Sequence, residues 1–303
     1  GIVRVDLTGQ VSVYTGAAPM GQGLRTALAQ ICAGEFGLKA SDINVVAGDT
    51  GPVPLGQGGF ASRQLITAGS SVLLASRSVA AKAKTLAGRI IEADESDLEL
   101  SDGNVHVAGA KDASVSLGEL ARILQGAPGY AFPEGMEPGL DATANFRTDA
   151  LAYANTCHIA EVEVDCETGG IALVNYIAVQ DAGRRINPMI VDGQIKGGIV
   201  HGIGNAIFEH IVHDSDGQPL ATNFADYLLP TATELPPIET VYTESPTHLN
   251  PLGAKGVGEV GTVPAAAAVI SAIEDALSEF AIRISQVPVS PQYIRRSIEQ
   301  AAR

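Results

Sequence analysis

The sequence predicts an α+β protein made of two mixed α/β lobes. Apolar patterns with the period of a strand alternate along the chain with patterns that have the period of a helix. The length of 303 residues allows one large domain or two of ordinary size, and a hydrophobic content of 46% can build a sizeable core. A stretch rich in proline and glycine, residues 126–150, is the expected linker. We therefore predict one lobe over 1–150 and a second over 151–303.

The first lobe is predicted from local signals. Leu24, Leu28 and Ile31 share one helical face, and Asp102-Gly103 is a hairpin signal. The expected elements are, in order, two strands within 2–14 joined at Thr8-Gly9, a helix over 21–36, a strand over 43–48, a long helix over 61–93, a hairpin around 102–103 and a helix over 116–124.

The second lobe combines a strand pair with two helices. The expected elements are a strand pair over 157–183 that turns at Thr168-Gly169-Gly170, a helix over 189–211, a strand over 239–243 and a helix over 262–279 with Thr262 as its N-cap. The helix 189–211 contains five glycines, each costing about 1 kcal/mol relative to alanine in an exposed helix. We expect a closely approaching backbone or a bulky ligand to explain them.

Charge and composition exclude several classes of function. The net charge of −15 argues against nucleic acid or an anionic membrane surface as a partner. The longest apolar stretch, 263–273, is shorter than the ~20 residues that span a bilayer. Three cysteines without CxxC spacing indicate a reducing, cytoplasmic setting. The chain starts inside a strand pattern without a signal peptide, so we expect a fragment or one half of a split chain.

A glycine-rich loop precedes the last predicted helix and carries one acid, Glu259. Gly256, Gly258 and Gly261 form G-x-G-x-x-G, so one hypothesis is an NAD-dependent dehydrogenase. That fingerprint should follow a strand at once, whereas "SPTHLNPLGAK" intervenes, and a glutamate would repel a pyrophosphate.

Free N–H groups at the helix start and the charge of Lys255 favour an anionic ligand beside this loop, where Glu259 would be placed as a general base. The alternative is that Glu259 only stabilises the helix dipole, by about 0.3–1 kcal/mol.

Two other loops and one helix share this design of glycines with amide side chains. They contain Gly21, Gln22 and Gly23, then Gly59, Phe60, Ala61, Ser62 and Arg63, and finally Gln194. Such segments are rich in amide donors and poor in metal ligands. Together they favour a large polar ligand with phosphates, bound by backbone and amides.

Five segments in order carry a resemblance that spans nearly the whole chain. They are "MGQGLRT" (20–26), "GGFASRQ" (58–64), "VQDAGRRINPMIVDGQIKGGIVHGIGNAIFE" (179–209), "DYLLPTATELP" (226–236) and "GAKGVGEVGTVPAAAAVISAIEDAL" (253–277). With them the chain resembles the molybdenum hydroxylase family, which includes xanthine dehydrogenase, aldehyde oxidoreductases and carbon monoxide dehydrogenase. The match is to the C-terminal half of the molybdopterin-binding subunit.

The resemblance implies a fold of the aldehyde oxidase and xanthine dehydrogenase type and an oxidative hydroxylation of an aldehyde or N-heteroaromatic substrate with water as oxygen source. Glu259 matches the family's general base, which takes a proton from a molybdenum-bound hydroxide. The pterin dithiolene holds the metal, so no side chain is expected to bind it. The residues matching the cofactor loops are Gly21, Gln22, Gly23, Gly59, Phe60, Ala61, Ser62, Arg63, Gln194, Lys255, Gly256, Val257 and Gly258.

The resemblance also implies partners and a form of the cofactor. Bacterial members usually carry molybdopterin cytosine dinucleotide, whose second phosphate would suit Arg63 or Lys255. The family's upstream half is missing here, so we expect a second chain that completes the active site, and subunits with 2Fe-2S clusters and FAD that remove electrons. A non-catalytic assembly subunit is the remaining alternative.

Several histidines are expected to have structural roles. His210 and His213 stand near Asp214 and Asp216, but "HDSDGQ" is typical of a hairpin turn and not of a metal site. His201, in the glycine-rich helix, is expected to be a packed core residue.

Overall fold

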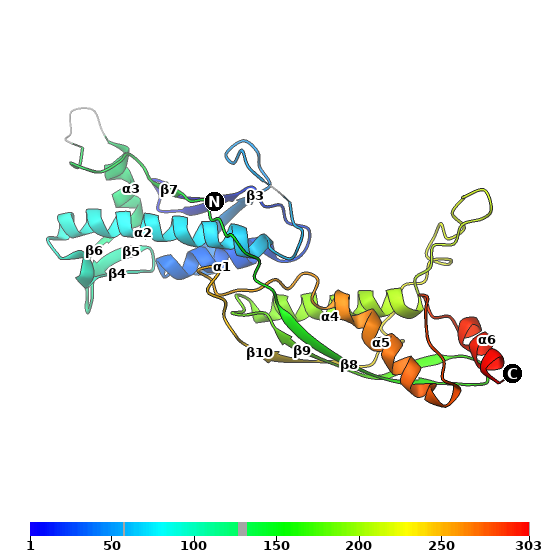
Figure 1. Ribbon diagram of the computed structural model, residues 1–303. Coiled ribbons are helices and arrows are strands. Elements are labelled where there is room, and N and C mark those ends of the chain that lie inside the picture. Colours follow the sequence, from blue (N-terminus) through cyan, green and yellow to red (C-terminus); the bar gives the residue numbers. More distant parts are fainter. Residues whose placement is uncertain (57, 127–131, 303) are drawn as a thin grey trace. The chain divides into compact units, whose positions relative to one another are not determined.

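The computed structural model describes residues 1–56, 58–126 and 132–302, which fall into two compact units. Unit 1 comprises Gly1–Ala152 and Thr247–Ala254, and unit 2 comprises Tyr153–Pro246 and Lys255–Arg303. Each unit combines helices with a sheet (Figure 1), so the predicted α+β class is confirmed. The predicted division at residue 150 stays a prediction, and so does the place of Glu259, the expected general base, in the second lobe.

Unit 1 is built on a four-stranded sheet of order β3-β2-β1-β7. The strands are β1 (Ile2–Val5), β2 (Val11–Thr15), β3 (Ile43–Ala47) and β7 (Leu140–Thr143). β1 is antiparallel to β2 and β7, whereas β2 and β3 are parallel and joined through helix α1 (Leu24–Phe36). Alternate valines of β1 and β2 point into the core, as the period of a strand requires. The predicted strand, helix, strand order is confirmed.

A long helix and a second sheet complete unit 1. Helix α2 (Ser70–Ile91) follows a π-helical turn, η2 (Leu65–Gly69), and packs beside α1 and against β1 and β7. The helix predicted over 61–93 thus begins later, at residue 65. The second sheet has the order β4 (Leu98–Ser101), β5 (Asn104–Val107), β6 (Ala110–Ser116), and helix α3 (Leu117–Gln125) follows it. The hairpin predicted at Asp102-Gly103 is confirmed, with both residues in the left-handed region.

The prediction of a linker over 126–150 is wrong for one part of that segment. Residues Leu140–Thr143 form strand β7, which pairs with β1, and Leu140 is buried. A strand of four residues is too short to show a reliable period, and its partner lies at the other end of the unit's sequence. Pro128, one of the prolines that indicated a linker, lies outside the described residues.

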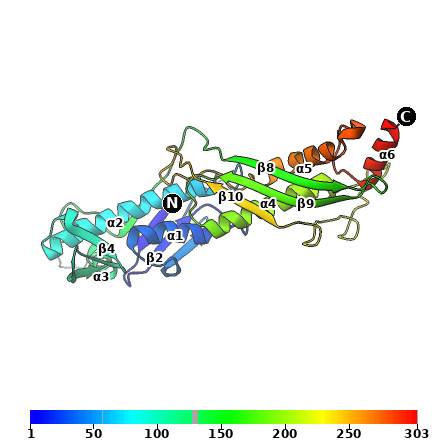
Figure 2. The same cartoon turned by 90° about the horizontal axis from the view of Figure 1, so that it is seen from below.

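Unit 2 has a three-stranded sheet of order β10-β9-β8, with helices on one face (Figure 1 and Figure 2). β8 (Asn155–Val164) and β9 (Ile171–Asp181) form the predicted antiparallel pair, and β10 (Ile238–Thr243) runs parallel to β9. Helices α4 (Pro188–Ile207) and α5 (Thr262–Ala276) pack on each other and on the sheet, a short 3-10 turn η4 (Ser278–Phe280) follows α5, and α6 (Pro291–Ala301) joins the same core.

Glycines set the close packing of α4 on α5. A Cβ at Gly202 would lie 2.5 Å from the Cβ of Ala265, and one at Gly198 would lie 3.0 Å from the backbone nitrogen of Thr262. A Cβ at Gly193 or Gly197 would meet nothing within 4 Å, and both residues are exposed. The expectation that a neighbouring backbone explains the glycines is therefore confirmed for Gly198 and Gly202 only.

Residues 208–237 form an irregular arm between α4 and β10 (yellow-green in Figure 1). His213 bridges to Pro219, and the N–H of Asp214 donates to the carbonyl of Gln218, so the predicted hairpin turn is confirmed. In the described residues no group of three or more His, Cys, Asp or Glu side chains is placed to hold a metal ion. His201 is exposed, so its prediction as a core residue was wrong. None of the described helices is long and apolar enough to cross a bilayer.

Candidate active site

Unit 1 brings two of the predicted cofactor loops together. The side-chain nitrogen of Gln22 donates to the side-chain oxygen of Gln64 at 2.5 Å, and the oxygen of Gln22 accepts from the backbone N–H of Met20 at 2.7 Å. Gln64 in turn donates to the carbonyl of Ala18 at 2.9 Å. A Cβ at Gly59 would lie 2.6 Å from the Met20 methyl, so the two loops are in direct contact. Amide side chains hold them at a fixed spacing.

The second of these loops has a strained backbone. Ala61 and Ser62 have φ angles of 54° and 52°, a region that residues with a Cβ rarely adopt and that costs about 1–3 kcal/mol for each residue. The guanidinium carbon of Arg63 lies 4.2 Å from the centre of the Phe60 ring. Phe60 and Met20 nonetheless stay 54% and 67% exposed. Strain combined with exposed apolar side chains is typical of a loop that contacts a ligand or another chain.

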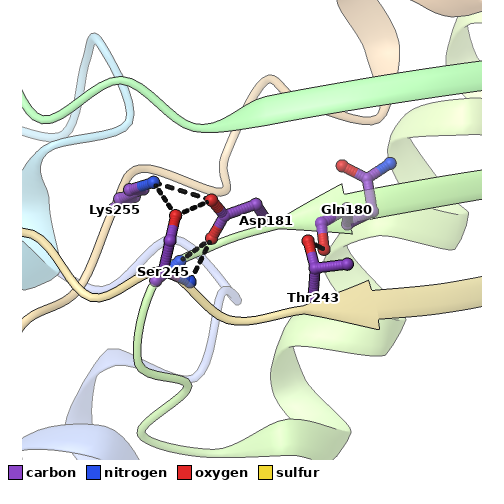
Figure 3. A network of polar contacts seen from close by, with 6 residues as sticks. Gln180, Asp181, Thr243, Ser245 and Lys255 are labelled. Carbon is purple, nitrogen blue, oxygen red and sulfur yellow. Dashed lines mark hydrogen bonds and ion pairs between the residues drawn. The ribbon is translucent and has the colours of Figure 1, made fainter.

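In unit 2, polar side chains gather where two parallel strands end. Asp181 and Thr243 are the last paired residues of β9 and β10, so the residues that follow both strands lie at the same sheet edge. There the Asp181 carboxylate accepts from Lys255 Nζ at 2.7 Å, from the Ser245 hydroxyl, and from the N–H groups of Gly183 and Ser245 (Figure 3). Lys255 Nζ also donates to Ser245 Oγ at 2.8 Å. We call Asp181, Ser245 and Lys255 the Asp181 cluster.

The Asp181 cluster is a charged pair removed from most solvent. The Asp181 and Lys255 side chains are each 11% exposed. Burial acts to raise the pKa of Asp181, but the hydrogen bonds from Lys255, Ser245 and the two N–H groups outweigh it, so this pKa lies well below its ordinary value of 3.8. The carboxylate is therefore ionised and opposite the ammonium. Lys255 does not present the unpaired positive charge that the sequence suggested.

The loop that carries Glu259 is held on both sides. The N–H of Lys255 donates to the carbonyl of Ala182 at 2.8 Å, and Gln194 Nε2 on α4 donates to the carbonyl of Gly258 at 3.0 Å. Val257, between them, packs against the core of unit 2. Glu259 itself is exposed.

The start of α5 differs from the prediction in one residue. The carbonyl of Glu259 accepts from the N–H groups of Thr262 and Val263, both at 3.0 Å. Thr262 is thus the first helical residue, and Gly261 takes the cap position without a side-chain bond. A Cβ at Gly261 would collide with the carbonyl of Ile195 on α4, so the close approach of α4 selects glycine at the cap.

The G-x-G-x-x-G at 256–261 lacks the setting of a dinucleotide fingerprint. The strand before it, β10, ends at Thr243, and the loop that follows passes through 247–254 in unit 1 before it reaches Gly256. A fingerprint needs its first glycine directly after a strand, so that the pyrophosphate meets the helix start.

Sequence reasoning missed Asp181 and Ser245. They are 64 residues apart, and Lys255 is 74 residues from Asp181. The sequence does place Asp181 at the end of one strand and Ser245 just after another. This signal becomes useful only when the parallel pairing of β9 and β10 is known, because that pairing brings the two strand ends together.

Comparison with known proteins identifies the fold and the family. Residues 1–236 match the family model of a molybdopterin cofactor-binding domain. The chain is 40% identical over 295 residues to the 6-hydroxypseudooxynicotine dehydrogenase complex subunit gamma of Paenarthrobacter nicotinovorans, covering 97% of this chain and 37% of that protein. It is 37% identical over 265 residues to the carbon monoxide dehydrogenase large chain of Afipia carboxidovorans, covering 86% of this chain and 32% of that protein.

Solved structures agree with these relatives. The quinoline 2-oxidoreductase of Pseudomonas putida 86 superposes with a TM-score of 0.89 at 40% identity, over 99% of this chain and 38% of that one. The Cu,Mo-CO dehydrogenase gives a TM-score of 0.87 at 34% identity, over 99% and 37%. The chain thus spans between 32% and 38% of the length of these relatives. By its sequence and its fold, it belongs to the molybdopterin cofactor-binding domain family of the molybdenum hydroxylases.

Proposed function

We propose that this chain is part of the molybdopterin-binding subunit of a molybdenum hydroxylase, in which Glu259 is the general base. The observation that carries the proposal is the loop 255–259, whose backbone is fixed at Lys255 and Gly258 while its single carboxylate stays exposed. A side chain held in this way can meet a reacting group with little reorganisation. Membership of the family supports the cofactor that this role requires.

The described residues fit a pterin cofactor. The pterin brings its own sulfur ligands, so the fit depends on backbone and amide groups and not on metal-binding side chains. In unit 1, the Gly21–Gly23 loop and the strained Gly59–Arg63 loop are held together by the Gln22 and Gln64 amides and would contact the cofactor through backbone N–H groups. In unit 2, the main chain of Gly256 to Gly258 would do the same, since the N–H of Lys255 already donates to the carbonyl of Ala182. The cytosine dinucleotide form is part of the same proposal, and the pairing of Lys255 with Asp181 counts against this lysine as the contact for its second phosphate.

The bound molybdenum centre would supply oxygen transfer and accept two electrons from the substrate. Glu259 would accept the proton released when a water-derived oxygen attacks an electron-poor carbon. Gln194 would hold the loop in place, because its side-chain nitrogen donates to the Gly258 carbonyl. The side-chain oxygen of Gln194 could then accept a hydrogen bond from a ligand.

The substrate class is proposed from the relatives. Two of them act, by name, on N-heteroaromatic compounds, as a nicotine 6-hydroxylase large subunit at 36% identity and a quinoline 2-oxidoreductase at 40% identity. We propose hydroxylation of an N-heteroaromatic ring, with an aldehyde as the alternative outcome of a substrate screen. Partner chains with iron–sulfur and flavin groups, and a cytoplasmic setting, belong to the same proposal.

Glu259→Gln in the complete enzyme complex tests the role of the glutamate. We expect turnover to fall by about 10²–10⁴-fold, the usual contribution of a general base, while the molybdenum content is unchanged. Glu279→Gln, at the other end of the α5 region and also exposed, is the matched control and should leave turnover unchanged. Normal turnover in Glu259→Gln with full molybdenum would refute the assignment of Glu259 as the general base.

A further inference from the structure

We infer that the Asp181 cluster positions the catalytic loop, and that Lys255 acts through Asp181 and not as a ligand of the cofactor phosphates. This inference rests on the proposed role of Glu259. Lys255 is four residues before that glutamate, and it is the first residue of the segment 255–303 that belongs to unit 2. The contacts that fix Lys255 therefore also fix the start of the loop 255–259, where it leaves the sheet edge.

The geometry assigns Lys255 to Asp181. Its ammonium donates to Asp181 Oδ2 at 2.7 Å and to Ser245 Oγ at 2.8 Å, and only 11% of the side chain is exposed (Figure 3). Two of the three donors of this ammonium are used by Asp181 and Ser245, and the carboxylate balances its charge. A phosphate would therefore meet a neutralised pair and not a free cation, and a lysine that left the pair would leave a buried charge without its partner. The side chain thus has a satisfied partner inside its own unit.

The Asp181 carboxylate connects three segments of unit 2 at one point. It accepts from Gly183 N–H at 2.9 Å in the turn after β9, from Ser245 after β10, and from Lys255 before α5. Because β9 and β10 are parallel, both strands end at this edge, and one carboxylate can reach all three segments. Charge-assisted hydrogen bonds are shorter and stronger than neutral ones, which suits a fixed junction.

A second contact stops the loop from turning about this junction. Gln194 holds the Gly258 carbonyl from α4, and the carbonyl of Glu259 accepts two N–H groups of α5. The backbone on both sides of the glutamate is therefore determined by unit 2 itself. A displacement of about 1 Å at a reacting group can cost on the order of 100-fold in rate, so loss of the cluster should reach the reaction without touching the cofactor.

The test uses the complete enzyme complex with three variants, Asp181→Asn, Lys255→Met and the double variant. We expect each single variant to lower kcat by about 10- to 100-fold with KM and molybdenum content retained, and the double variant to be no worse than the stronger single one. Hydrogen exchange of the amides in 255–263, measured by mass spectrometry on the same complexes, should become faster in all three. Lys255→Arg, which keeps the ion pair, should restore slow exchange and most of the rate.

Controls separate this inference from misfolding and from the function proposed above. Ser245→Ala removes the two side-chain bonds of Ser245, the one it donates to Asp181 and the one it accepts from Lys255, but keeps the ion pair. It should therefore show the same effects in a milder form, even if a larger change prevents folding. Glu299→Gln breaks the exposed Arg295–Glu299 pair of the same unit and should change neither exchange nor rate. Loss of molybdenum in Lys255→Met but not in Asp181→Asn would overturn the inference in favour of a phosphate ligand. Unchanged loop exchange in the variants would overturn it too, whereas normal turnover in Glu259→Gln would refute only the catalytic assignment.

Discussion

His158, in β8, is half-buried and contacts side chains of β9. Its Nδ1 is 2.8 Å from the hydroxyl of Tyr176, which is fully buried, and its Nε2 is 3.0 Å from the side-chain nitrogen of Gln180. Burial lowers the pKa of His158 to about 4, because an imidazolium loses its hydration there. The folded chain thus holds a neutral imidazole at pH values where the unfolded chain binds a proton.

This difference makes the stability of unit 2 depend on pH. Between the ordinary value of 6.5 and the folded value of about 4, the unfolded state binds more protons, so stability is full above this window and falls as pH decreases through it. We expect His158→Gln to flatten the dependence of the unfolding temperature on pH over this window. His213→Gln, which removes an imidazole from the exposed hairpin, is the control and should leave this pH dependence unchanged. Equal pH slopes in the His158 variant and the parent would contradict the prediction.

At the scale of elements, helix α4 has two kinds of glycine. Gly202 faces Ala265 of α5 at a distance that excludes a Cβ, whereas Gly197 faces open space. We expect Gly202→Ala to lower the free energy of unfolding by about 1–3 kcal/mol through overpacking. Gly197→Ala should raise it, by up to about 1 kcal/mol, through helix propensity. Urea unfolding of the two variants measures both changes in the free energy of unfolding. Equal changes in the two variants would mean that α4 and α5 do not pack as closely as the structure shows.

The same helix shows how far sequence patterns reach. The period of its apolar residues predicted α4, because that period is a local property. Which of its glycines serve packing depends on where α5 crosses, which no local pattern contains. Strand β7 was missed for a related reason, since its four residues become a strand only through pairing with β1.

For the whole molecule, the length of the relatives gives the main expectation. With 97% of its own length, the chain covers 37% of the 6-hydroxypseudooxynicotine dehydrogenase complex subunit gamma and 36% of the nicotine 6-hydroxylase large subunit. We expect this chain alone to retain little molybdenum, and to retain it stoichiometrically when produced together with the remaining part of the subunit. Metal analysis and native mass spectrometry of both preparations measure this. Full molybdenum occupancy in the isolated chain would contradict the need for a partner.

The sequence by itself determined the alternation of strands and helices, the glycine-rich loops and the family, because each depends on residues that are close together along the chain or on an ordered set of such segments. Only the tertiary structure decided that Lys255 is paired with Asp181, that Gln194 holds the Gly258 carbonyl, and that Gly261 and not Thr262 caps α5. Each of these contacts joins segments that meet because β9 and β10 are parallel or because α4 and α5 cross closely. Strand register and helix crossing arise from packing over the whole unit, so no local pattern could have predicted them.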